Sequence, residues 1–271
     1  MIRFLILVGY FEITMYLQLT GKLNQYINTH YAYLAYISSF ISFVLAIVQL
    51  IIWMKNIKVH SHLNGRLAKI SSPIILAIPV IISISFPTVT LNSETVSAKG
   101  YHFPLAQGSS STAAKQDGIT IQYLKPDTSL YFTSSSYQKE MKSELKAYQN
   151  SDKLNITAEN YMEVMELIYL YPDEFTHKTI TYTGFIYNET EKTNYQFLFR
   201  FGIIHCIADS GVYGLLTTGQ NISYKDNTWV TMTGKIELEY HQTLKQTLPV
   251  LHISSSHSVK EPSNPYVYRV F

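Results

Sequence analysis

The sequence predicts an α + β membrane protein. We expect transmembrane helices first, then an extracytoplasmic helical segment and a small antiparallel β-barrel of OB-like type. Three long apolar runs lie before residue 88, and none follow. Two segments with helical spacing of apolar residues come next. Five segments rich in aromatic and β-branched residues complete the chain, which is typical of a small β domain.

The three apolar runs extend from Phe4 to Leu19, from Tyr31 to Met54 and from Ile70 to Phe86. Each approaches the roughly 17 to 25 residues that an α-helix needs to cross a bilayer. A cleaved signal peptide is the alternative for the first run, because Arg3 precedes its apolar core. No small-residue cleavage site follows that core, so we expect the first helix to be retained.

Basic residues indicate how these helices are oriented. The segment between the second and third runs contains no acid and four cations: Lys55, Lys58, Arg66 and Lys69. The segment between the first and second runs contains only Lys22. Cytoplasmic loops are the ones enriched in Lys and Arg. We therefore expect a cytoplasmic N-terminus and an extracytoplasmic C-terminal domain.

The predicted domains are a membrane anchor at residues 1–87, a flexible tether at 88–133 and an extracytoplasmic domain at 134–271. The tether includes a low-complexity stretch at 107–118. After residue 87 the chain has eighteen acidic and fifteen basic residues. This balance disfavours nucleic acid as a partner, because phosphate binding depends on clustered cations. The single cysteine, Cys206, excludes an internal disulfide.

Two helices are predicted at the start of the C-terminal domain. The first follows the serines at 134–136, and its apolar residues recur every three or four positions: Tyr137, Met141, Leu145 and Tyr148. The second follows Thr157 and ends at Pro172. Its apolar stripe consists of Tyr161, Val164, Met165, Ile168 and Tyr169.

Strands are predicted at 178–187, 195–208, 213–218, 228–238 and 248–259. Gly184 and Gly234 occur in similar phrases, where a strand that bends around a barrel benefits from a missing side chain. Five strands after a helix favour an OB-type Greek-key barrel. A generic antiparallel sandwich is the alternative.

The candidate site lies in the phrase from Phe199 to Tyr213. Its candidate ligand-binding residues are Arg200, His205, Cys206 and Asp209, and His205 and Cys206 are the candidate zinc ligands. We expect this phrase to be a strand covered on both sides, so that these side chains are partly buried. On a strand, His205 and Cys206 would point to opposite faces. A metal would therefore need further ligands, and the nearest histidines in sequence are His241, His252 and His257.

A purely structural role is the favoured interpretation of the same residues, with His205 as a satisfied polar group. Cys206 would then be a core thiol, Arg200 a surface or capping charge, and Asp209 the start of a turn. The sequence contains none of the common catalytic or phosphate-binding motifs, so we expect no enzyme activity.

Two polar features stand out in the membrane anchor. Glu12 is alone among apolar residues, and carboxylates within a bilayer tend to face a partner or a water-filled path. It is therefore a candidate partner contact, although a position near the interface would also accommodate it. His60 and His62 form a pair in the inner loop that could bind a metal but is more often exposed.

Four phrases resemble the YcgQ-like family of uncharacterised bacterial membrane proteins. They are KLNQYINTHYAYL, QYLKPDTSLYF, RFGIIHCIADSGVYG and LPVLHISSSHSVKEPSNPYVYRVF. The resemblance implies the non-transporting subunit of a two-component permease, which pairs with a separate multi-span permease protein in the bacterial cell membrane. It implies no substrate and no mechanism.

We therefore expect an accessory permease subunit that contacts the lipid bilayer and a multi-span partner. The alternative is a membrane-anchored protein that binds a metal or another ligand outside the cell. A third hypothesis is an OB-type barrel that binds oligonucleotides or sugars. The acidic balance of the domain argues against nucleic acid, so cell-wall glycan is the ligand that remains open. This hypothesis requires that aromatic residues such as Tyr182, Tyr195 and Trp229 line an exposed face.

Overall fold

The computed structural model describes residues 1–57, 65–86, 88–99, 134–188, 195–219, 223–242 and 246–269. The chain divides into two compact units, Met1–Thr90 and Leu91–Phe271. We call these the helical unit and the sheet unit.

The helical unit contains the three predicted apolar helices. They are α1 (Ile2–Leu19), α2 (Ala32–Met54) and α3 (Arg66–Ser85), and two short 3₁₀ turns, Lys22–Gln25 and Thr29–Tyr31, join the first two. All three helices are long and apolar enough to cross a membrane.

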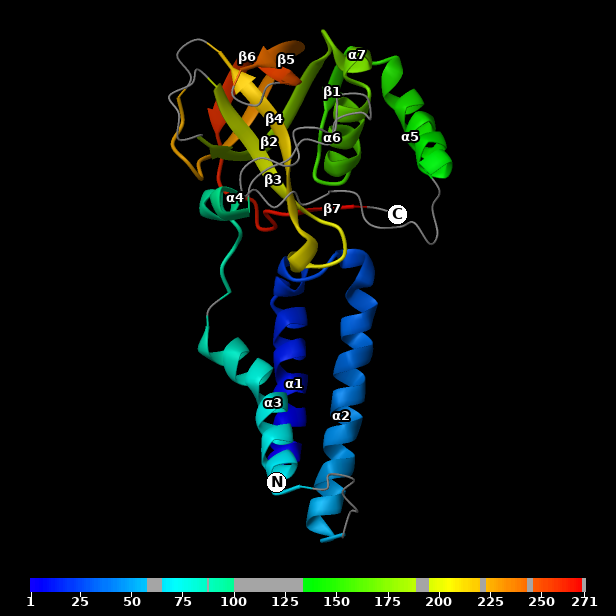
Figure 1. The fold of residues 1–271 in the computed structure, drawn as a ribbon, viewed down its shortest axis with the longest axis vertical. Coiled ribbons are helices and arrows are strands. Elements are labelled where there is room, and N and C mark those ends of the chain that lie inside the picture. The colour runs from blue at the N-terminus through cyan, green and yellow to red at the C-terminus, as the bar shows by residue number, and fades with distance from the viewer. Residues whose placement is uncertain are drawn as a thin grey trace. The chain divides into compact units, whose positions relative to one another are not determined.

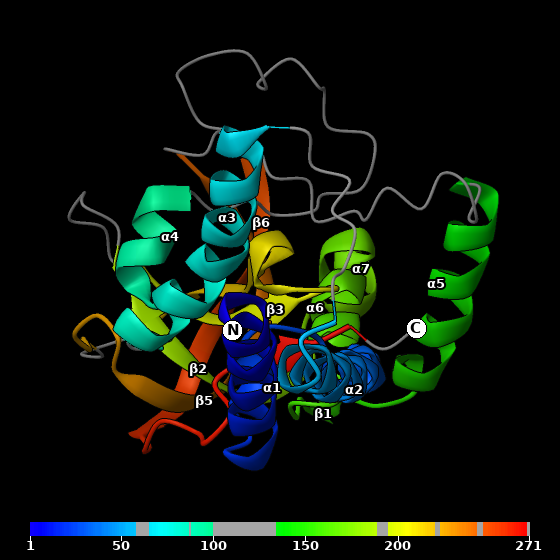
Figure 2. The ribbon, with the colours of Figure 1, turned by 90° about the horizontal axis from the view of Figure 1, so that it is seen from below.

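Contacts with both neighbours place α1 between α2 and α3. The rings of Phe11 and Phe43 lie 5.1 Å apart between α1 and α2, which run side by side when seen end-on in Figure 2. The Tyr10 hydroxyl donates to the Leu76 carbonyl of α3 at 3.0 Å. Gly9 leaves room for Val80, because a Cβ at Gly9 would lie 2.7 Å from the Val80 side chain. Close approach at small residues is a common mode of helix packing in membranes.

In the sheet unit, helices α4 to α7 come first, with the short strand β1 between α5 and α6, and the other strands follow (Figure 1). Its helices are α4 (Ser93–Lys99), α5 (Ser134–Gln149), α6 (Tyr161–Leu170) and α7 (Pro172–Phe175). Its strands are β1 (Lys153–Asn155), β2 (Thr179–Tyr187), β3 (Tyr195–Ile203), β4 (Gly211–Thr218), β5 (Trp229–His241), β6 (Gln246–Ser258) and β7 (Val267–Tyr268). Both predicted helices and all five predicted strands are present, with shifted ends.

The strands form one mixed sheet in the order β1-β2-β5-β6-β4-β3-β7. The prediction of a purely antiparallel five-stranded domain was therefore wrong in strand number and direction. Three pairs are parallel, namely β1 with β2, β4 with β6, and β3 with β7. β2 also pairs with β3 through residues 185–187. β1 and β7 have only three and two residues, too few for a recognisable alternation of apolar residues.

Gly184 and Gly234 lie where backbones approach closely. A Cβ at Gly184 would lie 2.6 Å from the Phe199 carbonyl oxygen, and one at Gly234 would lie 2.3 Å from that of His252. Gly234 also follows a register shift between β5 and β6. Both glycines thus allow a bend or bulge that a side chain would block.

The main core lies between α6 and the sheet. The predicted stripe of α6 is buried, and Met162 and Leu167 are buried as well, because α6 has neighbours on more than one side. Two tyrosine hydroxyls fix its position. Tyr161 donates to the Tyr213 carbonyl at 3.1 Å, and Tyr169 donates to the Gly214 carbonyl at 2.5 Å. Met141 and Leu145 of α5 join the same core.

A second apolar cluster covers the other face of the sheet. It contains the aromatic side chains of Phe185, Phe197, Phe199, Phe201 and Trp229 together with Val96 of α4. The Leu91 amide donates to the Tyr266 hydroxyl at 2.9 Å, and the Ser93 amide donates to Asn227 Oδ1 at 2.8 Å. Residues 91–99 therefore pack on the sheet unit, which differs from the tether predicted for them. Residues 100–133 of that tether lie outside the described residues.

Candidate functional site

The phrase that contains His205 and Cys206 forms a turn rather than a continuous strand. β3 ends at Ile203, and a short 3₁₀ helix follows at Ile207–Asp209. Half of the His205 side-chain surface is exposed, and Cys206 is partly buried. The expectation of a covered strand through residue 208 was therefore wrong, and it was wrong about the burial of His205.

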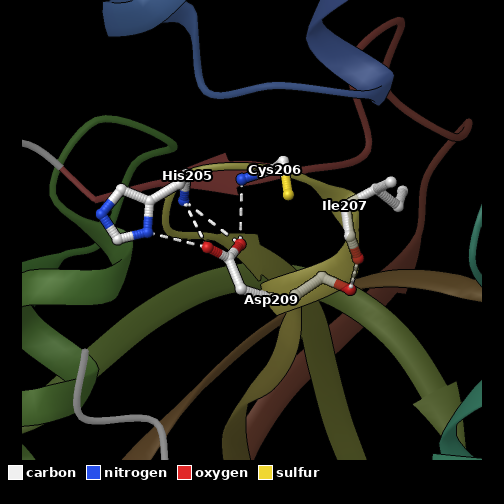
Figure 3. Close-up of polar contacts among 5 residues, drawn as sticks. His205, Cys206, Ile207 and Asp209 are labelled. Atoms are coloured by element: carbon white, nitrogen blue, oxygen red, sulfur yellow. Dashed lines mark hydrogen bonds and ion pairs between the residues drawn. The ribbon is translucent and has the colours of Figure 1, made fainter. Parts of the chain in front are cut away.

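Asp209 holds this turn together, as Figure 3 shows. Its carboxylate accepts from the His205 amide at 2.9 Å and from the Cys206 amide at 3.0 Å. It also contacts His205 Nδ1 at 2.8 Å. Cys206 and Asp209 form a reciprocal capping box at the start of the 3₁₀ helix. The prediction that Asp209 begins a turn was therefore wrong in its position, because Asp209 is the last residue of the 3₁₀ helix and β4 begins two residues later at Gly211.

The geometry offers little support for a metal at His205 and Cys206. The imidazole and the thiol project in different directions in Figure 3, and the carboxylate between them is occupied by amide donors. His241 instead lies against the Tyr195 ring, and His252 contacts Glu239. No group of three or more His, Cys, Asp or Glu side chains that could hold a metal occurs in the described part of the chain.

Arg200 is a buried cation that contacts the backbone of the C-terminal segment. Only 5% of its surface is exposed, and its guanidinium lies 5.7 Å from the ring centres of Tyr161 and Trp229. It donates to three consecutive backbone carbonyls, those of Asn264, Pro265 and Tyr266, at 3.0 to 3.3 Å. Burial lowers the pKa of this guanidinium. These hydrogen bonds tie the C-terminal segment to β3.

The aromatic residues expected on a glycan-binding face are not exposed. Tyr182 and Trp229 are buried, and Tyr195 is partly buried, with its hydroxyl donating to Glu239 at 2.8 Å. These three residues therefore do not form the exposed aromatic face that a glycan-binding barrel would require.

Glu12 lies on the free side of α1. Together with Leu5, Tyr16 and Leu19 it forms a line of exposed residues at spacings of seven, four and three. Such spacings place residues on one face of a helix. At 1.5 Å per residue, Glu12 is about 15 Å from Ile2 and about 10 Å from Leu19 along the helix. The helical unit therefore presents a carboxylate deep in an apolar segment. His60 and His62 lie outside the described residues.

Sequence reasoning missed a group of charged residues between α5 and α6. Burial, followed by the charges of Glu163, Glu140 and Glu166, raises the pKa of Glu144 to about 7, whereas Arg269 acts in the opposite direction. Glu166 forms an ion pair with Arg269 at 3.0 Å. The spacing of Glu140 with Glu144 and of Glu163 with Glu166 could have indicated acidic faces on both helices, but only the tertiary structure brings the two together.

Comparisons with known proteins also divide the chain into two parts, with the N-terminal match extending past Thr90 into the sheet unit. Residues 2–102 match the DUF1980 N-terminal domain, and residues 131–269 match the DUF1980 C-terminal domain. A Streptococcus mutans protein named "Putative two-component membrane permease complex subunit" is 68% identical over the full length of both chains. The Bacillus subtilis "UPF0703 protein YcgQ" is 35% identical, again over the full length of both.

No solved structure matches this chain. The two full-length relatives and the two matched domains nevertheless cover both units of the fold. They also confirm the resemblance that the four sequence phrases indicated. The chain is therefore a membrane protein of the DUF1980 family.

Proposed function

We propose that this chain is the accessory, non-catalytic subunit of a two-component membrane permease and that it docks on a multi-span partner through the free side of α1. The observation that carries the proposal is the exposed line of Leu5, Glu12, Tyr16 and Leu19. The name of the Streptococcus mutans relative, a permease complex subunit, supports the same class of function.

A carboxylate that faced lipid at the depth of Glu12 would be unfavourable. Insertion of an acidic side chain at the centre of a membrane helix costs about 2.5 to 3.5 kcal/mol. Glu12 faces away from α2 and α3, so neither of these helices lowers that cost. A polar group or a water-filled path on a partner would do so. The described residues contain three candidate membrane helices, which are few for a transport pathway without a partner.

We propose that the sheet unit is an OB-like module on the extracytoplasmic side. Support for the fold comes from the strand pairings: β2 pairs with β3 and β5, and β6 joins β5 to β4, which pairs with β3. These five strands form a ring of pairings. Support for the location comes from the cations of the 55–69 segment, which favour a cytoplasmic position for that segment.

Affinity purification from native membranes, followed by mass spectrometry, tests the proposed partner. The chain should retain a multi-span membrane protein in fixed ratio. Glu12→Gln should lower the retained amount at least about tenfold, which corresponds to about 1.4 kcal/mol of lost contact. Tyr36→Phe is the matched control, since Tyr36 is exposed on α2. Retention of no multi-span protein, or equal retention by both variants, would contradict the docking surface.

The alternative proposal is ligand binding at the turn of His205, Cys206 and Asp209. It is supported by the exposure of His205 next to a partly buried thiol. Zinc titration of the full chain in detergent tests it, with His205→Ala as the variant that should lose binding. His177→Ala serves as the control, because His177 is an exposed histidine that is not among the candidate ligands. Absence of binding at micromolar zinc would exclude zinc as this ligand.

A further inference from the structure

The Glu144 carboxyl group is partly buried against α6, among more acidic groups than basic ones. Its Oε2 atom is buried and has no hydrogen-bond partner among the described residues. Met141, three residues before Glu144, and Leu145, the residue after it, are buried in the core shared with α6. The contacts that dock α5 therefore also force this carboxyl group out of water.

The groups that face Glu144 are mostly negative. Glu163 and Glu166 approach from α6, and Glu140 lies one turn earlier on α5 itself. Arg269, which follows β7, is the opposing cation, but it is already paired with Glu166. An ionised Glu144 would thus be both desolvated and repelled. A neutral carboxyl group is much less costly to bury.

The C-terminal end of α5 is fixed independently of Glu144. Lys178 Nζ donates to the carbonyls of Tyr148, Gln149 and Ser151 at 2.7, 2.8 and 3.1 Å. A cation at this end also complements the helix dipole. Any release of α5 would therefore begin at its N-terminal part and pivot about Lys178. In Figure 1, α5 lies at the edge of the sheet unit, where such a movement crosses no strand.

We propose that α5 is a pH-dependent arm of the sheet unit, docked on α6 while the Glu144 carboxyl group is neutral and released from its N-terminal part when that group ionises. This inference does not depend on the permease proposal, because it uses only contacts within the sheet unit. It assigns to the acidic group between α5 and α6 a regulatory role that neither relative's name describes.

The direction of the pH effect follows from the pKa. The pKa of Glu144 when α5 is docked is about 7, above its ordinary value of 4.5. Docking is therefore fully favoured below about pH 4.5 and weakens as the pH rises to about 7. Solvent still reaches part of Glu144, which weakens the effect of its ionisation. We therefore expect the ratio of docked to released α5 to fall by about tenfold between low and high pH, which is less than the full pKa difference allows.

Distance measurements between two spin labels test the arm in the full chain in detergent. Labels at Lys139→Cys on α5 and Ser254→Cys on β6 would be placed in a Cys206→Ser background, since both positions are exposed. One distance should dominate at about pH 5, and a second population should appear at about pH 8. Met141→Ala, which removes a docking contact, provides the released reference at low pH.

Two variants separate the proposed group from its neighbours. Glu144→Gln should keep α5 docked at both pH values. Glu140→Gln removes one repelling charge but not the responding group, so it should keep the pH response and shift it to lower pH. An identical distance distribution at both pH values in the labelled chain that retains Glu144 would overturn the proposal. The same pH response in Glu144→Gln would overturn it too.

Discussion

Replacing Arg200 by Met distinguishes a structural cation from a ligand-binding one. The unbranched Met side chain can fill much of the same space but cannot donate hydrogen bonds. Three carbonyls, those of Asn264, Pro265 and Tyr266, would lose their donor in the buried contact with β3. We expect the C-terminal segment to detach from β3, because β7 adds only two residues of strand pairing.

The expected loss of stability is about 3 kcal/mol. Each buried carbonyl left without a donor costs about 1 to 3 kcal/mol, and we take the low value because water can reach a detached segment. The two ring contacts of Arg200 add up to about 1 kcal/mol, partly offset by the easier burial of Met. For a unit of this size, 3 kcal/mol corresponds to a fall in Tm of about 6 to 12 °C.

Thermal unfolding of the full chain in detergent, followed by tryptophan fluorescence, provides the assay. Trp229 lies in the sheet unit within 5.7 Å of the guanidinium and reports on this region, while Trp53 lies in α2. Lys235→Met is the control, because Lys235 is exposed on β5 and should change Tm by less than about 1 °C. If Arg200→Met lowered Tm no more than this control, the structural role of Arg200 would be refuted.

Three further predictions concern the sheet unit. Asp209→Ala removes the acceptor for the His205 and Cys206 amides and should cost about 1 to 2 kcal/mol in urea unfolding. A cost equal to that of an exposed Asp173→Ala change would contradict its anchoring role. Ile168→Ala, at a fully buried site on α6, should cost about 2 to 5 kcal/mol in the same assay, and a cost below 1 kcal/mol would mean that α6 is not part of the core. The unfolding free energy should fall as the pH rises from 4.5 to about 7, because the raised pKa of Glu144 makes the folded state bind the extra proton. Glu144→Gln should flatten this dependence of the unfolding free energy on pH. An unchanged dependence would mean that a group other than Glu144 binds the proton.

The membrane helices could be predicted because length and apolarity alone determine them. α1, α2 and α3 begin and end within four residues of the predicted runs. α6 could be predicted for a related reason, since its apolar spacing is helical throughout. These features are local, so a single sequence contains the information they need.

The turn after β3 could not be predicted in the same way. Ile203, Ile204 and Ile207 continue the apolar pattern of the strand, but the Asp209 carboxylate captures two backbone amides that a strand would pair elsewhere. A side chain that competes with the ladder in this manner leaves only a weak sequence signal. Asp209, Ser210 and Gly211 carry that signal, but they indicate a turn that starts at Asp209 and not one that Asp209 closes.

Contacts between segments that are distant in the chain could not be predicted from the sequence either. Arg200 meets residues 264–266, and the acidic faces of α5 and α6 meet only after the chain has folded. The parallel pairing of β4 with β6 joins strands separated by all of β5. Such pairings depend on the complete topology rather than on local pattern.

Photo-crosslinking along α1 in native membranes tests the central claim most directly. A photoreactive residue at Leu5 or Tyr16, on the exposed line with Glu12, should capture a multi-span membrane protein. The same residue at Ile13, on a more enclosed side of α1, should capture far less of it. Equal capture at all three positions, or capture of lipid alone at Leu5 and Tyr16, would contradict a permease subunit that docks through this face.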